Sequence, residues 1–386
     1  MLSSAIPMMS SDVYAADGDI ITTISVGSTP WGIAFDSTNN RMYVVNFAAG
    51  TVSVINTATN AVVDTISVGS NPIGIAFDST NNRMYVTNWG PNTVSVINTA
   101  TNAVDATITG VGTNPWGIAF DSTNNRMYVA NDSGAKVSVI NTATNAVVDT
   151  ISVGSNPIGI AFDSTNNRMY VTNWGPNTVS VINTATNAVD ATITGVGTGT
   201  RSIAFDSTNN RMYVTNDGSN TVSVINTATN AVDATITGVG TGTRSIAFDS
   251  TNNRMYVTND GSNTVSVINT ATNAVDATIT GVGSNPYGIA FDSTNNRMYV
   301  ADNGGVKVSV INTATNAVVD TISLGSKPYD IAFDSTNNRM YVTNNAWAKV
   351  SVIDVNSVTA PAQVGTVTIT PGTDTTALSW SAPSDG

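Results

Sequence analysis

The sequence contains no cysteine, no histidine and no glutamate. Without cysteine the chain has no disulfide, no thiolate nucleophile and no cysteine metal ligand. Without histidine, a serine nucleophile lacks its usual base, and haem lacks its most common axial ligand. These absences predict a non-enzymatic protein with no cofactor and no metal site.

Charge is also scarce, since only 10% of the residues are charged. The net charge of −12 combines 26 aspartates with 14 lysines and arginines. Such a balance disfavours a nucleic-acid partner, because phosphate backbones are bound by clustered cations. No apolar run reaches the roughly 18 residues of a membrane-spanning helix, so we expect no transmembrane segment. Glutamate is missing and glutamine occurs once, at Gln363, so strong helix formers are few.

One ten-residue stretch, FDSTNNRMYV at residues 35–44, recurs through the chain. Near-identical copies begin at Phe77, Phe120, Phe162, Phe205, Phe248, Phe291 and Phe333. Their spacing of 42 or 43 residues indicates eight copies of one supersecondary unit. Within the stretch, Asp and Asn are expected to build a turn, the arginine to balance the aspartate, and Tyr and Val to fill a strand. The pattern Asp36-x-Thr38-x-Asn40 lacks the glycine and glutamate of a calcium loop, so we interpret it as a turn.

Each unit contains four strand-like segments separated by short, turn-rich links. In the second unit they are residues 74–77, 83–87, 93–97 and 104–109. Links this short predict an antiparallel meander. The strands are apolar on both faces, so each sheet must be covered on both sides, as in a propeller.

The repeat count predicts an all-β, eight-bladed propeller, with seven blades as the alternative. The last unit lacks an outer strand of its own, and the segment Asp19–Gly27 matches the outer strands of the other units. We therefore expect this N-terminal strand to close the ring. The propeller is predicted to span residues 19–355 and to form a single, monomeric ring.

The two ends depart from the repeat. Residues 1–18 are interpreted as a leader remnant or a disordered tail, because Val13-Tyr14-Ala15 has the spacing of a signal-peptidase site without a full leader. Residues 356–386 are interpreted as a linker and a truncated module. Its segments 366–370 and 377–380 resemble the first two strands of a fibronectin type III domain.

The run Tyr-Val-Thr-Asn ends the repeated stretch in five units, at residues 85–88, 170–173, 213–216, 256–259 and 341–344. The other three read Tyr43-Val-Val-Asn46, Tyr128-Val-Ala-Asn131 and Tyr299-Val-Ala-Asp302. This run resembles the YVTN family of β-propeller repeats. The resemblance implies a surface-layer or cell-surface protein with an extracellular adhesion or scaffold role.

The copies differ mainly in two loops, one before the first strand of each unit and one after the second. We expect both loops on the same end of the ring, where binding surfaces usually lie. This varied end supplies the candidate ligand-binding residues: Trp31, Trp89, Trp116, Trp174, Arg201, Arg244, Tyr287, Tyr329 and Trp347. Trp89, Trp174 and Trp347 are expected to be exposed, whereas Trp31 and Trp116 are as compatible with packing between blades as with binding.

The sequence therefore predicts a non-enzymatic extracellular module that binds protein or glycan through the varied end. The alternative is a propeller enzyme of lactonase or lyase type. That alternative requires an asymmetric cluster of titratable groups at the channel mouth.

Overall fold

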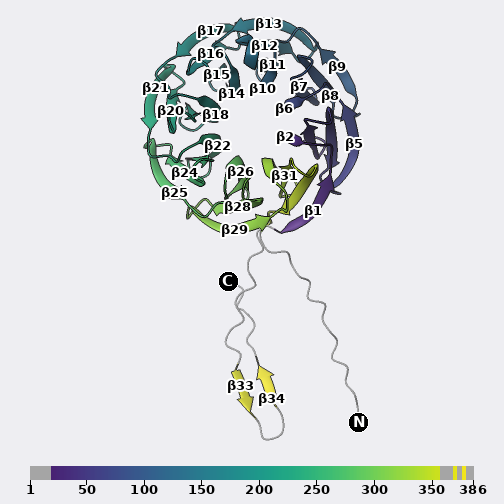
Figure 1. Ribbon diagram of the computed structural model, residues 1–386, viewed down its shortest axis with the longest axis vertical. Helices are drawn as coiled ribbons and strands as arrows, with labels where there is room; N and C mark the ends of the chain where they lie inside the picture. Colours follow the sequence, from purple (N-terminus) through teal and green to yellow (C-terminus); the bar gives the residue numbers. More distant parts are fainter. Residues whose placement is uncertain (1–18, 357–367, 372–375, 380–386) are drawn as a thin grey trace.

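The computed structural model describes residues 19–356, 368–371 and 376–379, and it shows a ring of eight four-stranded antiparallel sheets (Figure 1). The predicted eight-bladed propeller is confirmed, and the seven-bladed alternative is wrong. Each repeat forms one sheet because its links are too short for anything but neighbouring antiparallel strands.

The strands of each blade follow one another from the channel to the rim. The first strands surround the channel: β2 (Pro30–Asp36), β6 (Pro72–Asp78), β10 (Pro115–Asp121), β14 (Pro157–Asp163), β18 (Thr200–Asp206), β22 (Thr243–Asp249), β26 (Pro286–Asp292) and β30 (Pro328–Asp334). The second strands follow: β3 (Arg41–Asn46), β7 (Arg83–Asn88), β11 (Arg126–Asn131), β15 (Arg168–Asn173), β19 (Arg211–Asn216), β23 (Arg254–Asn259), β27 (Arg297–Asp302) and β31 (Arg339–Asn344).

The third and fourth strands complete each sheet. The third strands are β4 (Thr51–Asn56), β8 (Thr93–Asn98), β12 (Lys136–Asn141), β16 (Thr178–Asn183), β20 (Thr221–Asn226), β24 (Thr264–Asn269), β28 (Lys307–Asn312) and β32 (Lys349–Asp354). The rim strands are β5 (Ala61–Ser67), β9 (Val104–Ile108), β13 (Ala146–Ser152), β17 (Ala188–Ile193), β21 (Ala231–Ile236), β25 (Ala274–Ile279), β29 (Ala317–Ser323) and β1 (Ile20–Ser25). Among the described residues there is one short 3-10 turn, η1 (Asp132–Gly134), between β11 and β12.

The N-terminal strand closes the ring, as the sequence predicted. The eighth sheet has the order β1-β32-β31-β30, and β1 pairs antiparallel with β32. Backbone hydrogen bonds flank this pairing, from the Val26 amide to the Ala348 carbonyl at 2.9 Å and from the Asp354 amide to the Asp19 carbonyl at 3.0 Å. The first and last strands of the ring therefore lie side by side in one blade (Figure 1).

The hydrophobic core lies between neighbouring blades. Tyr43 and Val54 of the first blade face Met84 and Ile97 of the second, and all four side chains are fully buried. The opposite face of the first blade packs Met42 and its neighbours on the eighth blade in the same way. Two apolar faces per sheet are thus both covered, which is why the strands do not alternate strictly between apolar and polar residues.

The repeated FDSTNNR turn joins each blade to the next. Asp36 accepts hydrogen bonds from the backbone amides of Thr38 and Asn39, at 2.9 and 3.1 Å. The Asn39 side chain donates both to Asp36 and to Thr99 of the next blade. The turn was predicted, and its bond to the neighbouring blade is an additional function of the same residues.

The repeated arginine does not balance the aspartate of its own turn, contrary to expectation. Arg41 donates to the Thr99 carbonyl at 2.7 Å and to Asn102 at 2.8 Å, both in the next blade. Arg83 instead pairs with Asp105 on the rim strand of its own blade, at 3.0 Å. The turn carboxylate is already satisfied by backbone and amide N–H groups, so the arginine is available to bind elsewhere.

The two varied loops lie together at one end of the ring, as predicted. The Phe47 amide, after β3, donates to the Thr29 carbonyl before β2 at 2.9 Å, and the Trp89 amide donates to Asn71 in the same way. The repeated turns meet at the opposite end, where the Thr57 amide donates to the Asn40 carbonyl at 3.1 Å.

Beyond the ring, β33 (Thr368–Pro371) and β34 (Thr376–Ser379) pair antiparallel. The predicted fibronectin type III start falls partly on this hairpin and otherwise lies outside the described residues, as does the predicted leader. Among the residues described, no helix is long and apolar enough to cross a membrane.

Candidate functional site

The centre of the ring holds a cavity of about 690 Å³ lined by the first strands of the blades. The second residue of every first strand lines it: Trp31, Ile73, Trp116, Ile158, Arg201, Arg244, Tyr287 and Tyr329. The sequence placed these residues in a loop, but they lie inside the strands. A register irregularity between Pro30 and Ile33, repeated at the same place in the other blades, accompanies this position.

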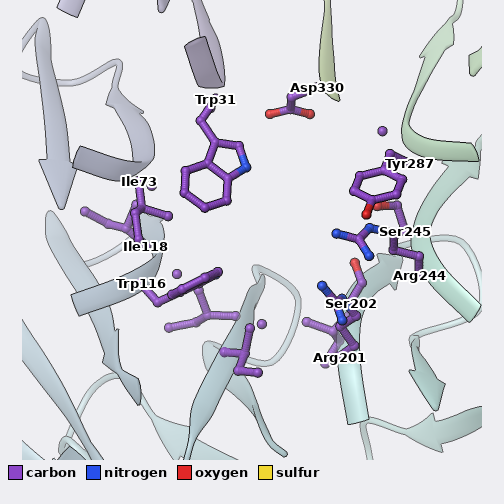
Figure 2. Close-up of a pocket in the computed structure, with 18 of the residues that line it drawn as sticks. Trp31, Ile73, Trp116, Ile118, Arg201, Ser202, Arg244, Ser245, Tyr287 and Asp330 are labelled. Atoms are coloured by element: carbon purple, nitrogen blue, oxygen red, sulfur yellow. The ribbon is translucent and has the colours of Figure 1, made fainter. Parts of the chain in front are cut away.

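One half of the channel wall is apolar and aromatic. Trp31 and Trp116 lie on either side of the blade that carries Ile73, and their ring centroids are 6.1 Å apart. Trp31 also packs edge-on against Phe47 at 4.7 Å and Tyr329 at 5.2 Å. Figure 2 shows the indole of Trp31 projecting into the open space of the channel. Trp31 therefore packs against its neighbours and is also half-buried at the cavity wall, so its role in binding stays a prediction.

The other half of the wall carries two arginines on adjacent blades. The Arg244 guanidinium lies 3.4 Å from the centroid of the Tyr287 ring and donates to Asp260 at 3.1 Å. Arg201 lies farther from its nearest carboxylate, that of Asp217, at 3.8 Å. Burial, together with the charge of Arg244, lowers the pKa of Arg201. Figure 2 places both arginines across the channel from Trp116.

Asp330 is a channel residue that the sequence reasoning missed. Seven blades have glycine or serine at this third position of the first strand, and the eighth has aspartate. This position is sterically crowded, because a Cβ at Gly32 would lie 2.6 Å from the Ile73 carbonyl of the next blade. The Asp330 carboxylate accepts a hydrogen bond from the Ile331 amide at 2.9 Å. The departure from glycine in an otherwise repeated frame was the signal that could have identified it.

The surroundings of Asp330 alter its acidity. Its side chain faces the channel space but is closely surrounded by protein. Burial raises the pKa of this carboxyl to about 6, against hydrogen bonds from the Ile331 and Ile33 backbones that favour the charged form. Asp330, Arg201 and Arg244 all line the cavity, so charged side chains are distributed unevenly around the channel.

The threonine of the Tyr-Val-Thr-Asn run supports the channel residue of the following blade. The Thr172 hydroxyl accepts from the Gly159 amide at 2.8 Å and donates to the Arg201 carbonyl at 2.9 Å. Equivalent bonds hold the carbonyls of Trp31, Trp116, Arg244 and Tyr287. Where the run has Val45, Ala130 or Ala301, this bond is impossible, and the next blade presents Ile73, Ile158 or Tyr329.

The remaining candidates lie around the channel mouth. Trp89, Trp174 and Trp347 expose 37%, 51% and 58% of their surface, which confirms the expected exposure. Trp174 also borders the cavity, whereas Trp89 and Trp347 do not line it. Seven of the nine candidate residues are thus brought to one cavity. Among the described residues, no group of three or more acidic side chains is arranged to hold a metal ion.

Solved structures similar to this chain share its fold at low sequence identity. The computationally designed Ika8 protein matches with a TM-score of 0.72 and 16% identity, over 85% of this chain and 98% of that one. The hydrazine synthase of Kuenenia stuttgartiensis matches with a TM-score of 0.62 and 16% identity, over 90% and 99%. The dihydro-heme d1 dehydrogenase NirN, in complex with DHE, matches with a TM-score of 0.72 and 13% identity, over 87% and 76%. At such identities these likenesses concern the fold alone.

Sequence comparison gives the family. No curated protein matches the chain. A family model described as "Lactonase, 7-bladed beta-propeller" matches residues 97–360, which is more than half of the sequence. Although its own ring has eight blades, the chain belongs to this lactonase-type β-propeller family.

Proposed function

We propose that this protein is a non-enzymatic binding module that receives the end of a glycan at the mouth of its channel. The observation that carries the proposal is the division of one cavity into an aromatic half and a hydrogen-bonding half. The C–H face of a sugar ring is apolar and packs well on an indole, while its hydroxyls need polar partners. Trp31 and Trp116 offer the first kind of surface, and Arg201, Arg244 and Asp330 offer the second.

A glycan suits this site better than a protein surface. A stable protein interface covers about 800 Å² per partner and is centred on a well-packed patch. Here the distinctive residues line a concavity, which admits a narrow end group. The exposed Trp89, Trp174 and Trp347 lie on the loops of the same end and could contact further sugar units. A cell-surface location is part of the proposal, supported by the cysteine-free, acidic composition and the resemblance to YVTN repeats.

The proposal is tested by glycan-array screening followed by calorimetry on the best ligand. Trp116→Ile introduces the residue that blades two and four carry at this position, so the fold should tolerate it. We expect this variant to bind at least tenfold more weakly, because it removes a stacking surface. Val148→Ala, at an exposed position on rim strand β13, is the matched control and should bind like the wild type. A protein that binds no glycan on the array would overturn the proposal.

A second candidate, lactone hydrolysis, is favoured by the family match and by Asp330. An ionised Asp330 could take a proton from water as the water attacks the lactone carbonyl. The ring ester bond would break, its oxygen would regain a proton, and a hydroxy acid would leave. The arginines could stabilise the oxyanion that forms during the attack.

This second candidate predicts a specific pH profile. Activity should rise with pH through about 6, where Asp330 loses its proton. Asp330→Gly, which restores the glycine found in five other blades, should abolish hydrolysis without unfolding the ring. A pH-stat assay against a panel of lactones measures both effects. No hydrolysis by the wild type, or equal hydrolysis by the variant, would eliminate this candidate.

A further inference from the structure

Resting on the proposed glycan site, we infer that the sugar received in the channel is an acidic one. Its carboxylate is bound between the Arg201–Ser202 and Arg244–Ser245 pairs of blades five and six. The inference concerns the chemical class of the ligand and its orientation, and it follows from the polar half of the cavity.

The two Arg-Ser pairs lie in identical stretches of sequence. Residues 195–237 and 238–280 are identical, so blades five and six place the same Arg-Ser dipeptide at the same point of β18 and β22. Both dipeptides line the cavity, and Figure 2 shows them on one side of it. Where the second residue of the first strand is apolar or aromatic, the third residue is glycine, except in the eighth blade, where it is Asp330. Serine therefore accompanies arginine at both places where arginine occurs.

These four side chains have hydrogen-bond donors to spare. Neither serine hydroxyl bonds to another described residue; only the backbones of Ser202 and Ser245 are engaged, by Thr215 and Thr258. The Arg201 guanidinium also donates no hydrogen bond within the described part of the chain, and its nearest carboxylate oxygen is 3.8 Å away. Arg244 is oriented by Asp260 and by the face of Tyr287. One arginine fixed by Asp260, one held only by a 3.8 Å ion pair with Asp217, and two free hydroxyls form a receptor for an oxyanion.

The two arginines repel each other, and the ion pairs with Asp217 and Asp260 offset only part of that repulsion. Partial burial also removes some of the water around Arg201. A carboxylate between them relieves this repulsion and replaces the lost water, and the planar guanidinium matches a carboxylate well.

Asp330 and the indoles fix the orientation of the sugar. Asp330 lies across the cavity, on the Trp31 side, where its charge repels a carboxylate but accepts hydrogen bonds from hydroxyls (Figure 2). The sugar ring is then bound over Trp31 and Trp116, with its acid group toward blades five and six. A neutral sugar satisfies the aromatic half of the site and leaves the arginine half without a partner.

Calorimetric titration with matched sugars tests the inference. The probes are the methyl glycosides of glucuronic and galacturonic acid, their neutral parents glucose and galactose, and glucose 6-phosphate. We expect the wild type to bind one of the acids 10- to 100-fold more tightly than its neutral parent, as charge-assisted hydrogen bonds allow. The variant Arg201→Ile/Arg244→Ile, carrying the residue of blades two and four, should lose this preference and bind the acid and its neutral parent with similar affinity.

Two further variants sharpen the result. Arg211→Gln removes a cation from blade five at the opposite end of the ring, where it pairs with Asp233, and should keep the full preference. The double variant Ser202→Gly/Ser245→Gly should lower the preference for the acidic sugar several-fold. Equal binding of acidic and neutral sugars overturns the inference and leaves the proposed function standing, whereas binding of no sugar overturns both. Tighter binding of the phosphate than of either acid also overturns the assignment to a carboxylate.

Discussion

At the scale of single residues, the copies of the repeat serve as controls for one another. In seven blades the second strand ends in asparagine, and Asn259 donates to Thr264 and Ser266 through its amide group. In the seventh blade Asp302 takes this place. It is fully buried and accepts from Ser309 at 2.6 Å, while its Oδ1 has no hydrogen-bond partner. Burial raises the pKa of Asp302 to about 6.

We predict that Asp302→Asn stabilises the protein at neutral pH. The folded pKa lies above the ordinary value of 3.8, so folding disfavours the ionised form, and stability falls as pH rises through about 6. The difference between the two pKa values corresponds to roughly 3 kcal/mol of unfolding free energy once both states are ionised. The gain should therefore be full at pH 8 and vanish below pH 4, as measured by urea denaturation. Asn259→Asp should lower the free energy of unfolding by a similar amount over the same pH range. A gain in stability for Asp302→Asn that did not change with pH would contradict this account.

The sequence revealed such residues only in part. Tyr299-Val-Ala-Asp302 stood out as a departure from the repeat, but nothing in the sequence showed that its carboxylate is buried. The eight tyrosines of the repeated stretch were expected to fill strands, and they do. The hydroxyls of seven of them also bond to the next blade, as Tyr85 does by donating to Asn145 at 2.6 Å. A contact across 60 residues of chain depends on how blades pack, which local pattern does not reveal.

At the scale of elements, the threonine of the second strand links the first strands of two blades. Its hydroxyl bonds an amide of its own blade and the carbonyl of the next blade's channel residue, as Thr172 does for Arg201. The bonded channel residues are the two tryptophans, the two arginines and Tyr287. These are large side chains whose position in the cavity depends on the backbone that carries them. The threonine is therefore a positioning residue for the site.

Two opposite substitutions test this role. Thr172→Val should lower the unfolding free energy by about 1 kcal/mol, because a buried hydrogen bond is lost while the shape is kept. It should also weaken binding in the channel several-fold by loosening Arg201. Val45→Thr should add the missing bond to the Ile73 carbonyl and raise stability by a similar amount. Denaturation and calorimetric titration measure both quantities, and a Val45→Thr protein no more stable than the wild type would argue against the bridge.

The limits of prediction are clearest for the first strand. Its predicted bounds in the second blade were residues 74–77, but β6 runs from Pro72 to Asp78. The strand begins earlier because Pro72 pairs with Asn88 across an irregular register, which no residue preference marks. Trp31, Arg201 and Tyr287 were correctly identified as varied positions. The sequence could not show that they face one another, because only ring closure brings their blades around a common axis.

At the scale of the whole molecule, closure of the ring depends on one strand contributed from the other end of the chain. The count of matching segments predicted this pairing correctly, since eight first strands and seven following rim strands left one rim strand to be supplied. β1 covers the edge of β32, and Ile24 packs with Val350 and Val352 in a cluster that includes Met42 of the first blade. The strand therefore completes the eighth blade and the contact between the eighth and first blades together.

We predict that deletion of residues 1–26 opens the ring, whereas deletion of residues 1–18, which spares β1, leaves it closed. Without β1 the backbone groups of β32 lose their partners, and an uncovered strand edge recruits other chains. The shorter deletion should melt like the full chain and elute as a single species. The longer one should melt at a markedly lower temperature and form concentration-dependent oligomers in size-exclusion chromatography with light scattering.

Because the missing strand is held by pairing and packing rather than by a covalent link, a synthetic peptide of residues 19–27 should restore the melting temperature. A peptide with Ile24→Asp should not, since it cannot enter the cluster of Val350 and Val352. If the longer deletion melts at the temperature of the shorter one, seven complete blades and a three-stranded eighth suffice for the fold, and β1 does not stabilise the closed ring.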